Sequence, residues 1–301
     1  MTKDNELFPK AVPELKRDDR FNQRNIESSS RFTDLSLASE EFGQDRGDKP
    51  VIIIGLGPSL NTDNGNGITL LEQLENDQDG IKVLAAAAHR LLNQEKLSTA
   101  DAAVFSLAST SPNWVEKVPA NMEYHLASIC PPELYEKIEK EGGTIKKFHA
   151  LDEGDYPENE IAIGAGTTGA TASLALYMAM GHKKFEFYGV DGALNGVPAH
   201  EYAIPIDDIA TGKDLESSPA GEIIKVKVDN QIFEVERGFY HQALELLEFI
   251  NTYGHNCEFT FYGDSLNSAC IEAGVKPEVI YDQRSNINID PNQPKPFDPL
   301  S

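Results

Sequence analysis

The apolar residues of this chain gather in short runs that alternate with longer segments of helical periodicity. The first run, Val51 to Ile54, has four β-branched residues and no polar alternation, which is typical of a strand buried on both faces. Further strands are predicted at Lys82 to Ala87, Ala102 to Leu107, Glu123 to Ile129, Ile145 to Phe148, Phe185 to Val190 and Glu258 to Tyr262. Helices are predicted from about Ile68 and at His89 to Lys96, Pro132 to Glu141, Thr168 to Met180 and Phe239 to Thr252.

This alternation predicts the fold class. Strands that alternate with helices form a parallel, helix-covered sheet, so we expect a Rossmann-like, doubly wound α/β fold with a mainly parallel sheet and helices on both faces. In such sheets ligands bind at the carboxyl ends of the strands. Gly55, Ser106 and Asp191 fall at those ends.

Three segments depart from the pattern. Residues 1–48 mix charges, Asn and Ser without sustained periodicity, so we expect a flexible or peripherally packed extension. The Rossmann-like domain is expected over residues 49–274, and residues 275–301 are expected to form a tail rich in Pro and Asn. Inside the domain, residues from about 205 to 236 contain two strand-like pieces around Asp229-Asn230, which predict an inserted hairpin.

The charge of the chain limits its partners. Its 49 Asp and Glu against 26 Lys and Arg give a formal net charge of -23, and such a field repels nucleic acid and anionic membranes. A phosphorylated ligand would therefore be held by backbone amides, helix N-termini or a divalent cation such as Mg²⁺.

Compartment and membrane topology follow from other features. The three cysteines are widely spaced, without a CxxC pair, and the first residues lack an apolar stretch of the signal-peptide type, so a cytoplasmic location is expected. Residues Ile161 to Gly181 carry no charge and approach the length of a membrane span. Their glycines and threonines cluster at the front, which favours a loop that opens a buried helix over a membrane span.

The most informative motif follows the first strand. Gly55 and Gly57 permit close approach of backbone N–H groups to an anion, and Pro58 and Ser59 complete the turn with a hydroxyl. We predict that these four residues bind the phosphates of a nucleotide. Leu60 replaces the third glycine of a dinucleotide motif, and no acid ends the second strand, so NAD binding is disfavoured. The alternative is a tight turn without a ligand.

A second glycine-rich segment precedes the predicted helix at Thr168. Gly166, Thr167 and Thr168 offer small residues, hydroxyls and N–H groups at a positive helix end, which predicts a second anion site. The alternative is an N-cap with close packing.

The third candidate group follows the strand that ends at Val190. Asp191 is predicted to bind Mg²⁺ or an acceptor hydroxyl, and His200 to act as an acid, a base or a phosphate contact. His89, Ser106 and Gly189 also fall near strand ends and are candidates for the pocket of the base or the acceptor.

Three of these stretches together resemble the MptE-like 6-hydroxymethylpterin diphosphokinase family. They are Val51 to Leu60, Gly166 to Ala172, and Phe185 to Gly192 with His200, and the resemblance covers roughly residues 50 to 270. It implies a Rossmann-like fold and Mg²⁺-dependent transfer of diphosphate from ATP to a dihydropterin. Relatives of that family include motility accessory factors that modify flagellin, and certain bacterial sialyltransferases share the Gly-x-Gly-Pro-Ser turn.

One departure from that family affects the predicted reaction. Family members carry an acid after the strand that here ends in Leu107-Ala108, and diphosphoryl transfer needs acids that hold the bridging cation. The missing acid weakens the diphosphokinase hypothesis specifically. The main hypothesis, which rests on the resemblance, is a diphosphokinase-like transferase that uses a nucleotide donor and a small-molecule acceptor. The alternatives are a glycosyltransferase that uses a nucleotide-activated sugar, and a nucleotide-binding module without catalysis.

Overall fold

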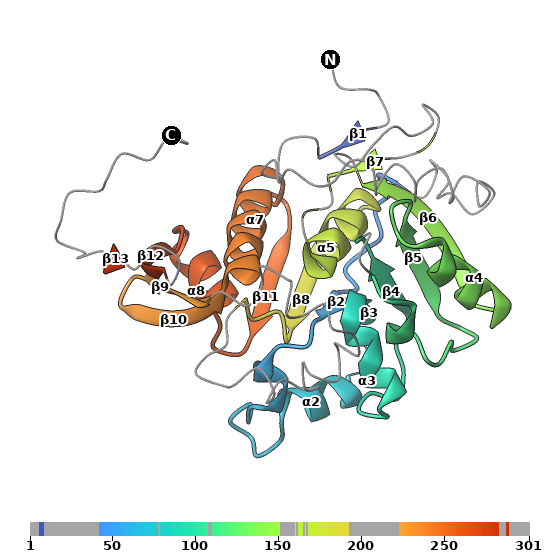
Figure 1. The fold of residues 1–301 in the computed structure, drawn as a ribbon, viewed down its shortest axis with the longest axis horizontal. Helices are drawn as coiled ribbons and strands as arrows, with labels where there is room; N and C mark the ends of the chain where they lie inside the picture. Colours follow the sequence, from blue (N-terminus) through green and yellow to red (C-terminus); the bar gives the residue numbers. More distant parts are fainter. Residues whose placement is uncertain are drawn as a thin grey trace.

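The fold is taken from a computed structural model of the chain, shown in Figure 1. The structure describes residues 6–8, 42–77, 79–107, 110–150, 160, 162–164, 166, 168–192, 223–282 and 287–288. The statements below concern these residues.

A parallel sheet forms the centre of the molecule. Its described part has nine strands in the order β1-β7-β6-β5-β4-β3-β2-β8-β11, and each neighbouring pair is parallel. The strands are β1 (Glu6–Leu7), β2 (Val51–Ile54), β3 (Ile81–Ala85), β4 (Ala102–Phe105), β5 (Glu123–Ala127), β6 (Thr144–Ala150), β7 (Ala162–Ile163), β8 (Lys184–Tyr188) and β11 (Glu258–Tyr262). The predicted α/β class with a parallel sheet is confirmed.

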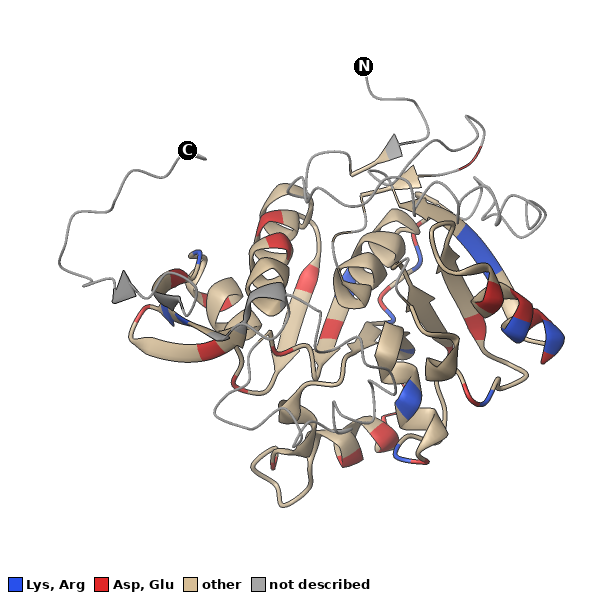
Figure 2. Cartoon of the chain, viewed as in Figure 1, with Lys and Arg blue, Asp and Glu red and all other residues tan. Residues whose placement is uncertain are grey.

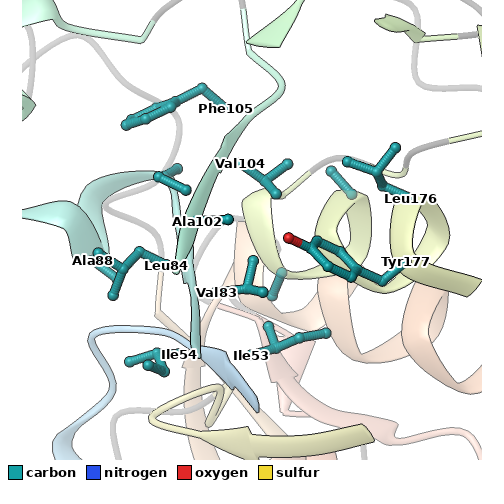
Figure 3. Packing of buried hydrophobic residues seen from close by; sticks show 14 of the residues in the cluster. Ile53, Ile54, Val83, Leu84, Ala88, Ala102, Val104, Phe105, Leu176 and Tyr177 are labelled. Carbon is teal, nitrogen blue, oxygen red and sulfur yellow. The ribbon is translucent and has the colours of Figure 1, made fainter. Parts of the chain in front are cut away.

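Helices cover both faces of this sheet. The side chains of Ile53 and Val83 point toward Tyr177 on one face, whereas those of Ile54 and Leu84 point to the other (Figure 3). Both faces must therefore be apolar, which explains why the strands lack polar alternation. The helices are α2 (Leu70–Asn76), α3 (Arg90–Asn93), α4 (Pro132–Lys140), α5 (Gly169–Ala179), α7 (Arg237–Tyr253) and α8 (Leu266–Ala273).

The strand order reverses next to β2. From β2 the chain moves through β3, β4, β5, β6 and β7 toward one edge, and it then returns to place β8 and β11 on the other side of β2. Right-handed crossovers put the helices of the two halves on opposite faces. The loops that leave β2 and β8 lie at the carboxyl ends of the strands where the order reverses, and α/β sheets bind ligands beside such positions.

Two predicted elements are cut short at residues with positive φ. The helix expected over His89 to Lys96 is reduced to a 3-10 turn, η4 (Ala86–His89), followed by α3. Glu95 has a φ of 57°, a left-handed conformation that interrupts a helix. Ala86 also has a positive φ, 48°, and it ends β3 before the predicted Ala87.

The inserted hairpin is confirmed, and it belongs to a second sheet. Strands β9 (Ile223–Val228) and β10 (Gln231–Glu236) pair antiparallel around Asp229. Their buried side chains, among them Val226 and Val235, pack with residues of α7 and α8. The remainder of the predicted insert lies outside the described residues.

The prediction of a tail from residue 275 is wrong for part of its length. Strand β12 (Glu278–Asp282) pairs antiparallel with β9, and β13 (Ile287–Asn288) pairs with β12. An isolated segment of this composition cannot bury enough apolar area to fold, but β9 supplies an open edge and Val279 packs on the second core. The composition therefore predicted how the segment behaves in isolation, but it did not predict that the segment pairs with β9.

The N-terminal extension also contributes to the sheet. Strand β1 pairs with β7 at the sheet edge, and the Phe8 ring packs edge-on against Phe249 and Tyr253 of α7. The prediction of peripheral packing is therefore confirmed for residues 6–8. No helix in the described part of the chain is long and apolar enough to cross a membrane, and the apolar segment after Ile161 supplies the buried helix α5.

Candidate functional site

The Gly-x-Gly turn fastens the end of β2 to the end of β8. Gly55 N–H donates to the Tyr188 carbonyl (2.8 Å), and Gly57 N–H donates to the Gly189 carbonyl (2.7 Å). A Cβ on Gly55 would overlap the Gly189 carbonyl oxygen, and a Cβ on Gly57 would overlap the Asp191 carboxylate. Both glycines are therefore required by close backbone approach.

These contacts change the role expected for the two glycines. Because β2 and β8 are paired in register up to Ile54 and Tyr188, the hydrogen-bonded ladder continues into the turn. The N–H groups of Gly55 and Gly57 are thereby committed to protein carbonyls rather than directed at an anion. Of the four residues of the motif, Pro58 and Ser59 reach the pocket described below.

Asp191 forms the polar centre of this junction. Its carboxylate accepts Ser59 N–H (2.8 Å) and the Ser59 hydroxyl (2.6 Å) on different oxygens, and the residue is 3% exposed. Burial raises its pKa to about 6, against the lowering effect of the Ser59 bonds. In this geometry Asp191 is a positioning residue that holds the η3 turn (Pro58–Asn61) on the loop after β8.

Helix α8 completes the junction from a third direction. The Asn267 side chain donates to the Val190 carbonyl (2.7 Å), and Asn267 N–H donates to the Asp191 carbonyl (3.1 Å). Sequence reasoning missed this helix. Its signals are the serine pair Ser265 and Ser268, which form a reciprocal cap, and Gly274 at its C-terminus with a φ of 65°.

A pocket of about 650 Å³ opens over this junction. It lies at the carboxyl ends of β2 and β11, and both α2 and α8 begin at its wall with the side chains of Thr69 and Ser265 as caps. Its lining consists of Pro58, Ser59, Thr62, Asp63, Asn64, Asn66, Leu70, Gln73, Gln231, Phe261, Tyr262, Gly263, Asp264, Ser265, Ser268, Ala269 and Glu272.

The lining of the pocket is rich in hydroxyls, amides and carboxylates. Among the described residues that form it, none is Lys, Arg or His. Figure 2 shows basic positions on β6 and α4, at the far end of the sheet from β11. A site of this composition offers hydrogen bonds in both directions but no fixed cation for a highly charged anion.

One wall of the pocket is stiffened by its own hydrogen bonds. The Asp63 carboxylate accepts Gly65 N–H (2.7 Å) and Gly67 N–H (3.0 Å). Gln73 accepts from the Asn64 side chain (2.8 Å) and donates to the Tyr188 hydroxyl (3.0 Å). This polar loop is thus attached to the sheet and does not depend on a ligand for its shape.

The second glycine-rich segment forms a helix cap. Thr168 is the N-cap of α5 and exchanges hydrogen bonds with Thr171, and its hydroxyl accepts from the Gln242 side chain of α7 (2.9 Å). Gly166 has a φ of 68°, and a Cβ there would overlap the Thr171 side chain. For Thr168 the capping alternative is confirmed. Thr167 lies outside the described residues.

His89 is a core residue rather than part of a ligand pocket. It is fully buried, and its Nε2 atom lies 3.0 Å from the Tyr124 hydroxyl. Burial lowers its pKa to about 4, so the ring is neutral at physiological pH. His89 is the last residue of η4, and it does not line the pocket described above.

The other candidates differ in position. Ser106 is 1% exposed, and its hydroxyl has no hydrogen-bond partner within the described residues. Gly189 has a φ of 62° and accepts from Gly57 N–H, so it belongs to the junction and not to a base pocket. His200 lies outside the described residues.

A second buried polar network occupies the ends of β5 and β6. The Glu160 carboxylate lies 2.9 Å from Lys147 Nζ and 2.7 Å from His149 Nε2, and His149 Nδ1 lies 2.7 Å from the Ser128 hydroxyl. Burial lowers the pKa of His149. A carboxylate only accepts, so the neutral ring carries its proton on Nε2 and accepts from Ser128 at Nδ1.

The residues present do not fit an Mg²⁺ site built on Asp191. Both of its oxygens already accept from Ser59, and the described residues contain no group of three or more His, Cys, Asp and Glu side chains able to hold a metal. Mg²⁺ prefers near-octahedral oxygen coordination. We therefore assign no step to a metal.

Comparisons with known proteins indicate a fold. No protein-family model and no curated protein sequence matches the chain. Among solved structures, it is similar to the MAf glycosyltransferase from Magnetospirillum magneticum AMB-1, with a TM-score of 0.51 and 12% sequence identity. The similarity covers 88% of this chain and 43% of the other, so the chain spans less than half the length of that protein. At this identity, the similarity shows a shared fold.

Proposed function

We propose that the chain is a glycosyltransferase that moves a sugar from a nucleotide-activated donor to an acceptor hydroxyl. The observation that carries the proposal is the polar pocket at the reversal of strand order, where folds of this class bind ligands. The fold shared with a MAf glycosyltransferase supports the same class of reaction.

The composition of the pocket favours sugar transfer over diphosphate transfer. Transfer of diphosphate from ATP relies on cations that bridge the phosphates and on carboxylates that hold them. Asp191 is committed to Ser59 and is not free to hold such a cation. A sugar requires hydroxyl, amide and carboxylate partners, and these are the groups that this pocket supplies.

The reaction breaks the bond between the anomeric carbon of the donor and its phosphate oxygen, and it forms a bond from that carbon to the acceptor oxygen. The acceptor hydroxyl loses its proton to a base, and the departing phosphate takes the negative charge. The carboxylates of Asp63, Asp264 and Glu272 line the pocket and are the bases within reach. His200 remains the candidate acid for the departing phosphate, on sequence grounds.

The test combines binding and turnover with the full chain. Thermal unfolding is followed with CMP, UDP, GDP and ADP sugars, ATP and a dihydropterin, each with Mg²⁺ or with EDTA, because a specific ligand raises the melting temperature. Release of nucleotide from each sugar donor is then measured. We expect one nucleotide sugar to stabilise the protein in EDTA and to be consumed.

A pocket variant and a matched control sharpen this test. Asp264→Asn alters an exposed carboxylate of the pocket, and Asp48→Asn alters an exposed carboxylate far from it. We expect only the first to slow turnover. Stabilisation by ATP and dihydropterin that requires Mg²⁺, with AMP as product, would replace this proposal with diphosphoryl transfer.

A further inference from the structure

The edge of the sheet presents an aromatic ring to the pocket. Tyr262 is the last residue of β11, which is the final strand of the sheet as described. Its ring stacks on that of Tyr188, with centroids 4.2 Å apart and planes at 19°. No described strand follows β11 in the sheet, so no described strand covers the opposite face of the Tyr262 ring. Tyr262 is half-buried and lines the pocket.

The Tyr262 ring is held in place by its neighbour Tyr188. Tyr262 and Tyr188 are paired in register across β11 and β8, and the Tyr188 hydroxyl accepts from Gln73. A ring that is already ordered loses little conformational freedom when a ligand stacks on it. Tyr262 is therefore a preformed platform, and stacked aromatic faces bury the C–H surface of a ring-shaped ligand.

The charges around this platform limit the ligand. Asp63, Asp264 and Glu272 carry the charges of the described lining, without a Lys, Arg or His among those residues. The chain as a whole has a formal charge of -23. A carboxylate or phosphate on a ligand would meet repulsion here, whereas a hydroxyl or ammonium group finds acceptors.

We infer that the pocket is a saccharide subsite that takes an uncharged or amine-bearing sugar ring, stacked on Tyr262, and disfavours acidic sugars. The neutral hydrogen-bonding groups come from Thr62, Asn66 and Gln231. An amine-bearing ring gains further from the carboxylates and from the aromatic face. The inference rests on the proposed function in one respect only, because it takes the pocket to be the acceptor side of sugar transfer.

Nucleobase stacking is the competing use of the ring. A nucleobase arrives with at least one phosphate in any nucleotide donor, and the lining offers that phosphate no cation. Binding of CMP, UMP or AMP that depends on Tyr262 would overturn the inference.

The experiment measures binding of three matched rings to the full chain by ligand-observed NMR. Methyl glucoside, glucosamine and glucuronate share one scaffold and differ in charge. We expect the first two to bind and glucuronate to bind about tenfold more weakly, and we expect added salt to narrow that difference. Glucuronate binding as tight as that of methyl glucoside would contradict the inference.

Two substitutions at Tyr262 distinguish the loss of ring stacking from the loss of the fold. Tyr262→Phe keeps the stack and should bind methyl glucoside within about twofold of the wild type, whereas Tyr262→Ala should weaken binding about tenfold. Equal binding by the wild type and a folded Tyr262→Ala variant would overturn the role of the ring.

A third variant leaves Tyr262 unchanged and tests the charges of the pocket. The double substitution Asp264→Asn with Glu272→Gln should reduce the preference for glucosamine over methyl glucoside about tenfold. Glu258→Gln, at the opposite end of β11, is the matched control and should leave the preference unchanged. A preference that survives the double substitution would contradict the electrostatic part of the inference.

The two proposals fail in different ways. If sugars bind as expected but no nucleotide sugar is consumed, the proposed function is wrong and the subsite stands. If a nucleotide sugar is consumed while none of the three rings binds, the inference is wrong and the proposed function stands.

Discussion

The same edge of the sheet carries two buried polar networks, and among the described residues only one of them contributes to the lining of the 650 Å³ pocket. At the ends of β2 and β8, Ser59 and Asp191 share two hydrogen bonds, and Ser59 also lines the 650 Å³ pocket. At the ends of β5 and β6, the side chains of Lys147, His149 and Glu160 are each 5% exposed or less, and none lines that pocket.

The second network resembles catalytic machinery in its connections. Ser128, His149 and Glu160 are hydrogen bonded in the order of a serine, histidine and acid triad. Lys147 pairs with the same carboxylate, and Ser128 is 1% exposed. The comparison teaches that buried polar residues at strand ends occur both at the pocket and away from its lining, and that the pocket lies beside the reversal of strand order, where α/β sheets bind ligands.

The largest loss of stability is expected in the second buried polar network, at the ends of β5 and β6. Glu160→Gln removes the charge that compensates Lys147 and is expected to lower the free energy of unfolding by about 3–5 kcal/mol, measured by urea denaturation. The matched control is Glu95→Gln, whose exposed carboxylate pairs with Lys117. It should have no measurable effect, because exposed ion pairs contribute little. Equal losses in the two variants would contradict a structural role for the network.

A smaller loss of stability is expected for a substitution in the junction beside the pocket. Gly57→Ala places a Cβ against the Asp191 carboxylate and 2.7 Å from the Gly189 carbonyl oxygen, and overpacking of this kind costs about 1–3 kcal/mol. Ligand binding should fall together with stability, because the junction shapes the pocket. Gly142→Ala, between α4 and β6 and outside the pocket lining, is the control, since its Cβ would meet nothing within 4 Å and only its φ of 82° is strained. Loss of stability without loss of binding would separate the junction from the site.

A pH series tests the raised pKa of Asp191 through the stability of the protein. The pKa of Asp191 is raised from 3.8 to about 6, so the folded state binds a proton more tightly than the unfolded state. The protonated carboxyl then contributes stability at low pH that is lost as pH rises toward 6. Between pH 7.5 and pH 5 the wild type should gain about 1 kcal/mol relative to Asp191→Asn, measured by urea denaturation at each pH. A constant difference between the two proteins would contradict the raised pKa.

The smallest effect is expected for covalent labelling of Ser128. A fluorophosphonate reacts with an accessible activated serine, and Ser128 is almost completely buried. Mass spectrometry should find no adduct at this position in the native protein. An adduct there, absent in Ser128→Ala, would make the second network a reactive site and remove the contrast between the two regions.

Local patterns predicted most of the sheet, because each strand is short and apolar. Strand β2 matches its predicted range Val51 to Ile54, and β11 matches Glu258 to Tyr262. The apolar run of β2 and the alternation of β11 can be read from the sequence itself. Strand β12 was missed because its stability comes from pairing with β9, a partner far away in the chain.

The candidate site was located more accurately than it was interpreted. The Gly55 to Ser59 turn and Asp191 do lie together at the strand reversal, but their groups bond to each other. A sequence shows that N–H groups and a carboxylate are present, and it does not show which acceptors they reach. Asn267 and Tyr262 were not predicted as site residues, since their roles follow from the packing of α8 and from the position of β11 at the sheet edge.

The pairing of β9 with β12 has a consequence for synthesis on the ribosome. Lys227 of β9 lies opposite Glu278 of β12, so the hairpin emerges well before the strand that covers its edge. During that interval β9 presents unpaired backbone groups and its apolar side chains, features that promote association between nascent chains. Slow translation of the last segment would therefore lower the yield of native protein even though every contact of the finished fold is unchanged.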